Sequence, residues 1–347
     1  MTKSKNWPSV LLCSALLCAC TGKSETPLPN YAERLSRALE QTVQPAAPYR
    51  ARLPRPRELQ VPVSSGTIDL LDLLALDDCA LQVTIAKSNS SLGKLATDSQ
   101  SLLLALEFLQ LVPACIETLR QSNQSQLAAA LAIAQLSKQQ QLPALIWNAT
   151  LGGPEFRQLW KIPAHLGQFP NTSSDAVGVA LARLLASITA WLQGDYTVGR
   201  TQLESLLGTI RQGQGGALLR AESLQAATLA AATSAVKQRR DKQAMCFEGH
   251  PGPQAKILET VVLKYFVGEV QPWLVQMERQ RRSLLPTVRS LENTLAAVTP
   301  PGYQAWQLLR DQQLTVARSQ PKEHAQALSE LLHSCGLAPG AAPQYPN

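Results

Sequence analysis

Cysteine residues are the clearest sites of chemistry in this chain. It has 347 residues and seven cysteines, and Cys20 closes the tetrapeptide Leu17-Cys18-Ala19-Cys20. A basic start and a short apolar run over residues 10–17 precede Cys20. This order is typical of a bacterial lipoprotein signal, in which the chain is cut before a cysteine that receives acyl chains. Because Cys20 follows the small Ala19 whereas the two earlier cysteines follow leucine, we expect cleavage before Cys20 and lipidation at it.

The expected anchor predicts where the protein lies. Thr21 follows Cys20, and in enteric-type sorting the lack of an aspartate at this place favours transfer to the outer membrane. Two or three acyl chains hold a protein durably, unlike a single chain. The rest of the sequence shows no apolar run that we expect to span a bilayer. We therefore expect a body on the periplasmic face of the outer membrane, with the membrane as a partner through the N-terminal lipid.

Four further cysteines predict disulfides, because an even number in an exported chain is typical of paired thiols. Of the three pairings that four cysteines allow, we expect Cys79–Cys115 and Cys246–Cys335. A turn near residues 93–97 brings the first two onto adjacent antiparallel helices, although at ~1.5 Å per residue Cys115 lies several ångström farther from the turn. The second bridge would join the turn before a long helix to the end of the last helix and would fix the C-terminus.

The remaining residues capable of chemistry do not form recognisable groups. The histidines have neither the helical spacing nor the carboxylate partners of a zinc site: His165, His250, His324 and His333. The sequence also lacks the motifs of a serine-nucleophile elbow and of a phosphate-binding loop. We therefore expect no metal, no cofactor and a protein that is not an enzyme.

Charge argues against nucleic acid as a partner. The formal net charge is +7, and the loss of two lysines with the signal lowers it to +5. Nucleic-acid-binding proteins concentrate basic residues on one face or in one motif, and the sequence shows no such motif.

The elements that position these residues are expected to be helices. Thr97 and Gln100 form a capping box at a helix start, and Gly93 is expected to end the preceding helix in a left-handed conformation. Apolar residues recur every three or four positions from Leu258 to Leu295, which predicts a long helix packed antiparallel on its predecessor. The predicted fold class is all-α: an elongated helical bundle with a long antiparallel helical hairpin in the C-terminal half, preceded by an extended Pro/Arg-rich segment.

Prolines and glycines set the expected helix ends. Pro143 is expected to end a helix over residues 126–141, and Pro321 to begin the last helix, which Gly336 would end. The helix that starts near residue 172 is expected to turn Val179 inward, in register with its other apolar residues.

Composition divides the chain into five parts. They are a signal peptide over 1–19, a tether over 20–30, a helix and extended Pro/Arg segment over 31–64, an all-helical body over 65–336 and a disordered tail over 337–347. Proline prevents a helix in the Pro/Arg segment, which we expect to lie extended over the body. The segment is either a solvated connector or a patch for anionic lipid headgroups.

The segment Asn89-Ser90-Ser91-Leu92-Gly93-Lys94, with Cys79 upstream and Ser99-Gln100 downstream, resembles the signature of a family of uncharacterised proteobacterial lipoproteins. The resemblance extends over the lipobox, the Pro/Arg segment and the helical body. In that family a basic residue directly precedes the asparagine, whereas this chain has Ser88 there and Lys87 one position earlier. The family is classed only as a domain of unknown function, so the resemblance implies location and topology and brings no activity.

We interpret this segment as a structural corner between two helices. Capping accounts for its glycine and for Thr97 and Gln100, but leaves Asn89 and Lys94 partly unexplained. We therefore expect Asn89 and Lys94 also to contact a partner.

Two functions agree with these features. The first is a non-catalytic interaction or scaffold protein that presents a helical surface to another envelope protein. The second is a carrier that binds a lipid or other apolar ligand between helices, lined by Trp147, Phe156, Trp160 and Trp191. A third candidate, an envelope hydrolase, is favoured less than these two. Aromatic residues at helical spacing are more often core, which favours the first. A large apolar cavity would favour the carrier, and an exposed apolar patch the partner surface.

Overall fold

A computed structural model of the chain describes residues 26–48, 51–64, 79–170, 174–242, 245–247 and 250–337. Elements of its first half are α1 (Leu28–Leu39), α2 (Pro56–Leu59), α4 (Leu81–Asn89), α5 (Ser91–Lys94), α6 (Asp98–Gln121), α7 (Ser125–Ala149) and α8 (Pro154–Leu159). Those of its second half are α9 (Ser174–Leu192), η1 (Arg200–Gln202), α10 (Leu203–Arg211), α11 (Gly215–Lys242), β1 (Cys246–Phe247), β2 (His250–Pro251), α12 (Pro253–Val261), η2 (Val262–Val270), α13 (Gln271–Thr294), η3 (Ala296–Val298) and α14 (Pro301–His333). Cys20, the predicted signal peptide, residues 65–78 and the tail from residue 338 lie outside the described residues.

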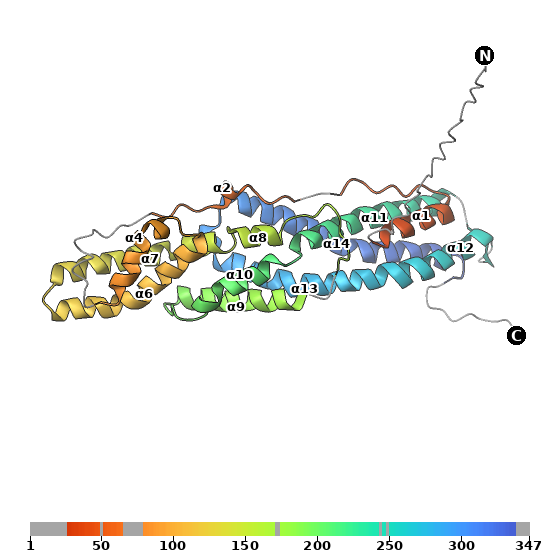
Figure 1. Cartoon of the computed structure of the whole chain (residues 1–347). Helices are drawn as coiled ribbons and strands as arrows, with labels where there is room; N and C mark the ends of the chain where they lie inside the picture. The colour runs from red at the N-terminus through yellow and green to blue at the C-terminus, as the bar shows by residue number, and fades with distance from the viewer. Residues whose placement is uncertain are drawn as a thin grey trace, which may run out of the picture.

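The helices form a rod, which confirms the predicted all-α, elongated bundle (Figure 1). The α6–α7 hairpin makes one end of the rod, and α1, α11, α12 and α14 make the other. The extended segments over residues 41–48 and 51–64 run along one side of the rod, and the second contains the single turn α2. The strands β1 and β2 pair antiparallel over two residues each, at the α12 end.

The predicted C-terminal hairpin is present, but its packing differs from the expectation. The long helix α12–η2–α13 runs antiparallel to α14, and α11 runs parallel to α14, since Gln313 bonds to Leu219 and Gln225 to Ala317. Helix α11 packs most extensively on α14, and α13 on α9, rather than α13 on α11. Buried alanines on both α11 and α14 explain this choice, because small side chains let two helix axes approach closely: Ala221, Ala232, Ala235, Ala317 and Ala327.

Two of the expected helix ends are wrong. Helix α7 continues through Pro143 to Ala149, and α14 begins at Pro301 and continues through Pro321. A proline inside a helix costs roughly 3 kcal/mol. The turn after Pro143 buries Ile146 and Trp147 completely, and burial of side chains of this size gains roughly 1.5–3 kcal/mol each. Tertiary packing therefore outweighs the local preference.

Helix α9 buries most of the apolar face expected from the sequence, but Val179 points outward. Val179 is 53% exposed, whereas Leu181, Leu184 and Ile188 are fully buried.

By length and composition, Asp98–Gln121 and Asp175–Leu192 are apolar enough to cross a membrane, in contrast to the expectation from sequence. Of their most apolar windows, 50% and 39% respectively are buried inside the bundle.

The described segments before α4, residues 26–48 and 51–64, pack on the helical body. Helix α1 begins at Leu28, inside the predicted tether, and its Leu28, Tyr31 and Leu35 are buried against α11 and α12. The following segment is extended as predicted, except that Pro56 starts the one-turn helix α2, where the Glu58 carboxylate accepts from the Arg55 N–H. Proline is tolerated there because the first turn of a helix has no partner for its N–H.

Candidate functional site

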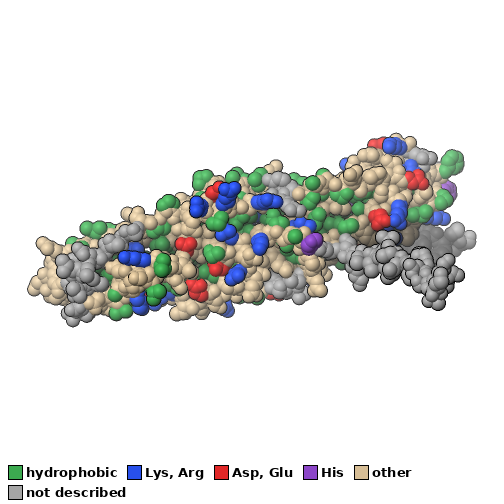
Figure 2. Space-filling model, turned by 45° about the horizontal axis from the view of Figure 1, so that its top comes forward, with side chains coloured by type: hydrophobic (Ala, Val, Ile, Leu, Met, Phe, Trp, Pro, Cys, Tyr) green, Lys and Arg blue, Asp and Glu red, His purple; other side chains and the backbone are tan. Residues whose placement is uncertain are grey.

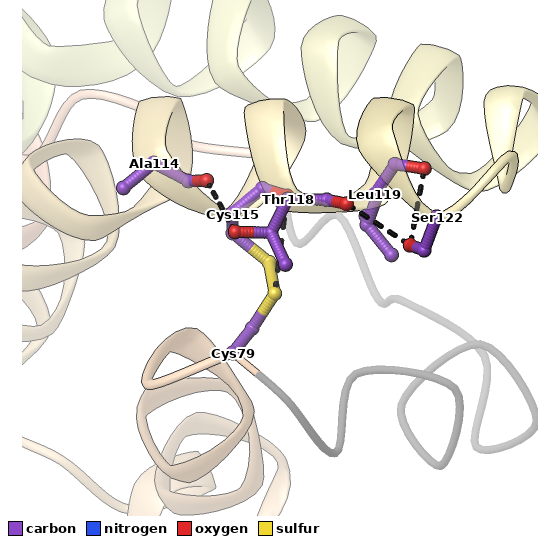
Figure 3. The surroundings of a disulfide bond; sticks show 6 residues. All are labelled: Cys79, Ala114, Cys115, Thr118, Leu119 and Ser122. Atoms are coloured by element: carbon purple, nitrogen blue, oxygen red, sulfur yellow. Dashed lines mark hydrogen bonds between the residues drawn. A yellow bond between two sulfur atoms is a disulfide. The ribbon is translucent and has the colours of Figure 1, made fainter.

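The Cys79–Cys115 disulfide ties the start of α4 to α6, as predicted. The two Cα atoms are 5.4 Å apart, within the range of disulfides. Figure 3 shows Cys79, just before α4, reaching across to Cys115 on α6, near Thr118, whose hydroxyl donates to the Ala114 carbonyl. Cys79 lies before the helix rather than on it.

Backbone caps hold the corner between α4 and α6. The Ser90 hydroxyl oxygen accepts from the Gly93 N–H at 3.0 Å and caps the single turn α5. The predicted capping box is confirmed: the Gln100 N–H donates to Thr97 Oγ1 and the Thr97 N–H donates to Gln100 Oε1. Asn89 ends α4 and Lys94 ends α5, so both flank this corner.

The expected left-handed conformation of Gly93 is wrong. Gly93 lies inside α5 and has no positive φ. A Cβ atom at this position would lie 2.2 Å from the Lys87 carbonyl oxygen and 2.5 Å from that of Ser88. The glycine is therefore needed because α5 crosses close to the last turn of α4, and not for a special backbone dihedral.

Two leucines project from the corner into solvent. Leu92 is 82% exposed and Leu95 is 81% exposed, the highest values among the large apolar side chains that the structure describes. A short helical turn has too few positions to bury an apolar face, and capping bonds rather than burial hold this one. The corner thus presents an apolar surface beside the exposed Lys94.

A cleft of about 570 Å³ lies beside the same corner. It lies between α4, α6, α7 and the chain at Val63, and Asn89, Gly93 and Lys94 line it. Lys138 of α7 also lines it, and burial lowers the pKa of its ammonium group. The structure therefore brings both predicted contact residues together with a lysine that sequence reasoning missed. Helical spacing is the signal that could have identified this lysine. Lys138 lies on the same, inner face of α7 as Leu131, Ala134, Leu142 and Leu145.

At the other end of the rod, Cys246 and Cys335 form the second expected disulfide, with Cα atoms 5.2 Å apart. The link joins the short β1–β2 hairpin to the end of α14. Gly336 ends α14 with φ of +67°, and the Leu337 N–H donates to the Leu332 carbonyl, so the predicted C-cap is confirmed. Cys79, Cys115 and Cys335 are buried, and Cys246 is partly buried.

The histidines do not assemble. Among the residues that the structure describes, no group of three His, Cys, Asp or Glu side chains could hold a metal ion. His324 is buried, and its Nδ1 lies 3.1 Å from Thr233 Oγ1, whose own hydrogen goes to the Leu229 carbonyl. Nδ1 is therefore the donor and Nε2 accepts from the Tyr31 hydroxyl. Burial lowers the pKa of His324 to about 3, so the ring is neutral and structural.

The aromatic residues proposed to line a ligand cleft are core instead. Trp147, Phe156, Trp160 and Trp191 are at most 3% exposed. Trp160 and Trp306 stack beside the guanidinium of Arg310, at 5.4 and 5.0 Å from their ring centres.

Arg310 is fully buried and donates two hydrogen bonds to Glu292, of 2.6 and 2.9 Å. Burial alone would lower the pKa of Arg310, but the bonds and charge of Glu292 outweigh it and raise the pKa. Tyr303 donates to the same carboxylate at 2.7 Å. These groups are fully paired, which indicates a structural role.

A second buried carboxylate is less well paired. Glu222 on α11 lies 3.5 Å from the guanidinium of Arg281 on α13. Burial raises the pKa of Glu222 to about 7, against the opposing charge of Arg281. The side chain lines a surface depression together with Arg279, Arg318 and Glu278, and Glu278 also pairs with Arg281.

Basic side chains are spread rather than gathered on the face shown in Figure 2. Lys and Arg lie along the middle of that face among polar and apolar side chains and form no continuous stripe. The arrangement on this face differs from the concentrated basic surface typical of nucleic-acid binding.

Comparison with known proteins identifies a family and nothing finer. No curated protein and no solved structure matches the chain. One family, described as "Protein of unknown function (DUF3080)", matches residues 28–339, from the start of α1 to just beyond the Gly336 cap. This match covers the corner, the cleft and both disulfides. The chain therefore belongs to the DUF3080 family of proteins of unknown function.

Proposed function

We propose that this chain is a lipid-anchored, non-catalytic interaction protein of the cell envelope. Acylation at Cys20 would hold it on the periplasmic face of the outer membrane, and the body would present the corner from Ser88 to Leu95 to a partner protein. The two disulfides support an oxidising compartment, since such links do not persist in a reducing cytosol.

The observation that carries the proposal is the exposure of Leu92 and Leu95 on a rigid support. Exposed apolar side chains cost solubility and mark interaction surfaces when they are grouped. Here the capping bonds and the Cys79–Cys115 disulfide fix the segment that carries them. Lys94 lies between the two leucines in the chain and forms no ion pair with a described residue. The partner surface expected from this chemistry is apolar with an acidic residue at its edge.

The described residues also support a non-catalytic role. The buried titratable groups in the bundle centre, Arg310 with Glu292 and His324 with Tyr31, use their polar atoms on one another. None of these four residues lines the cleft beside the corner or the depression at Arg281, and a catalytic group needs access to a substrate.

Site-specific photo-crosslinking in cells tests the partner surface. A photoreactive residue placed at position 92 or 95 should give the same crosslinked partner from both sites, and Lys94→Glu should weaken the product. Position 308 is the matched control, because Leu308 is a leucine on α14 that is 73% exposed. Equal products from position 308, or a product that Lys94→Glu leaves unchanged, would contradict the proposed surface.

Membrane fractionation tests the anchor separately. Cys20 is outside the described residues, so its support is the sequence pattern alone. Cys20→Ala should leave an uncleaved precursor or a soluble periplasmic protein. A Cys20→Ala protein that still fractionates with outer membranes would show that the anchor is not at this residue.

A further inference from the structure

The cleft beside the corner is lined by two chemically different kinds of side chain. The apolar ones include Ile85, Leu104, Phe108 and Leu145. The polar ones include lysine ammonium groups and hydroxyls, from Lys94, Lys138, Ser101 and Ser137. The cleft volume of about 570 Å³ lies within the range of about 300–1,000 Å³ found for small-molecule sites.

Lys138 is the most informative of the polar residues that line the cleft. It is partly buried on the inner face of α7, and no described carboxylate lies within ion-pair distance of it. A buried ammonium group without a partner loses hydration that nothing in the protein replaces. An anion in the cleft would supply the missing partner, and the lowered pKa of Lys138 reflects the same loss of hydration.

Gln141, one turn after Lys138, adds a second unsatisfied group. Its Oε1 atom is buried and has no hydrogen-bond partner, while its Nε2 donates to Ser137 Oγ at 3.1 Å. Rotation of the amide by half a turn would let the Ser137 hydroxyl donate to Oε1 and would leave the NH₂ group at the buried position without a partner. The donors that line the cleft with a positive charge are therefore Lys138 and Lys94.

One acidic residue also lines the cleft. Asp98 accepts from Gln60 at 3.4 Å and lies at the start of α6. Two lysines against one aspartate leave the cleft with a net positive charge. The apolar lining residues favour a ligand with an apolar part over a bare inorganic ion, because a bare ion would leave these residues exposed to water.

We propose that this cleft binds an anionic amphiphile: a phosphate or carboxylate group that Lys138 and Lys94 contact, joined to a short apolar substituent that packs on Ile85 and Phe108. Such a group can come from the headgroup region of an acidic membrane lipid or from a soluble ester. The site lies next to the leucine surface, shares Lys94 with it and requires no partner protein.

Calorimetric titration of the full lipidated protein in phosphatidylcholine nanodiscs tests this assignment. Hexyl phosphate should bind, whereas hexanol should not bind and inorganic phosphate should bind at least tenfold more weakly. Lys138→Gln should weaken hexyl phosphate binding at least tenfold, and Lys138→Arg should retain it. Lys237→Gln is the matched control, because Lys237 is an exposed lysine on α11, away from the cleft.

The outcomes distinguish two sources of the ligand and show which results would contradict the proposal. If the natural ligand is a membrane lipid, nanodiscs that contain phosphatidic acid should compete with hexyl phosphate; if it is a soluble ester, they should not. Equal binding of inorganic phosphate and hexyl phosphate would show that the apolar lining residues do not contribute to ligand binding. Absence of hexyl phosphate binding, or equal losses in Lys138→Gln and Lys237→Gln, would overturn the site. None of these results depends on crosslinking at the corner.

Discussion

The Asn148 side chain holds the backbone of Val61 by two hydrogen bonds of 2.8 Å each. Its Oδ1 accepts from the Val61 N–H, and its Nδ2 donates to the Val61 carbonyl. Two tryptophans hold the same extended segment: Trp147 Nε1 donates to the Leu59 carbonyl at 2.7 Å and Trp306 Nε1 to that of Ala51 at 3.1 Å. The segment is therefore an integral part of the fold rather than a solvated connector.

Asn148→Ala should destabilise the protein by roughly 2–4 kcal/mol, because it leaves a peptide N–H and a carbonyl without partners. Urea unfolding measures the change. Asn293→Ala, at an exposed position near the end of α13, should change the unfolding midpoint little. Equal midpoints for the two variants would mean that the segment is not held by Asn148.

Gly93→Ala should destabilise the fold by roughly 1–3 kcal/mol, since its Cβ would overlap the Lys87 carbonyl oxygen. Gly208→Ala is the matched change, because no atom lies within 4 Å of a Cβ there and the residue is exposed in α10. It should stabilise by about 0.5–1 kcal/mol through helix propensity. Thermal melting of both variants checks the prediction, and a Gly93→Ala protein that melts like the parent would exclude the close crossing of α4 and α5.

The two disulfides should differ in what they contribute. Their sequence separations are 36 and 89 residues. Loop-closure entropy then predicts that removing Cys246–Cys335 costs about 0.8 kcal/mol more than removing Cys79–Cys115. Paired serine variants, compared by urea unfolding after non-reducing peptide mapping, measure the difference. A larger cost for the shorter loop would show that local strain or packing outweighs chain entropy.

His324 should make the protein less stable in acid. Burial lowers its folded-state pKa from 6.5 to about 3, so between these values the unfolded chain binds a proton that the folded protein does not. Stability therefore falls as the pH falls from about 6.5, by up to about 1.4 kcal/mol per pH unit. His324→Gln, which stays neutral, should reduce this slope in unfolding measured across the same pH range. Identical slopes would contradict a neutral buried ring.

Arg310→Met should cost roughly 3–5 kcal/mol, because it leaves the buried Glu292 carboxylate without its cation. Arg289→Met removes an exposed arginine from the same region, 3.3 Å from Asp311, and should cost less than about 1 kcal/mol. Chemical unfolding compares the two. Similar costs would show that the buried ion pair contributes no more to the free energy of unfolding than the exposed pair.

Local sequence determined much of the secondary structure. The Thr97–Gln100 capping box and the Gly336 cap depend on contacts between residues a few positions apart, so their residue types suffice to predict them. Helical periodicity likewise predicted the all-α class, and the order of the helices predicted the two disulfides.

Tertiary packing decided the rest. Whether Pro143 and Pro321 end a helix depends on how much apolar surface the next turn buries, and that surface is supplied by distant residues. The parallel pairing of α11 with α14 and the outward turn of Val179 follow from the fit between facing helices. For the candidate site, the sequence alone indicated Asn89 and Lys94. Lys138 lies more than forty residues later and meets them only because the α6–α7 hairpin folds back, a long-range contact that no local pattern encodes.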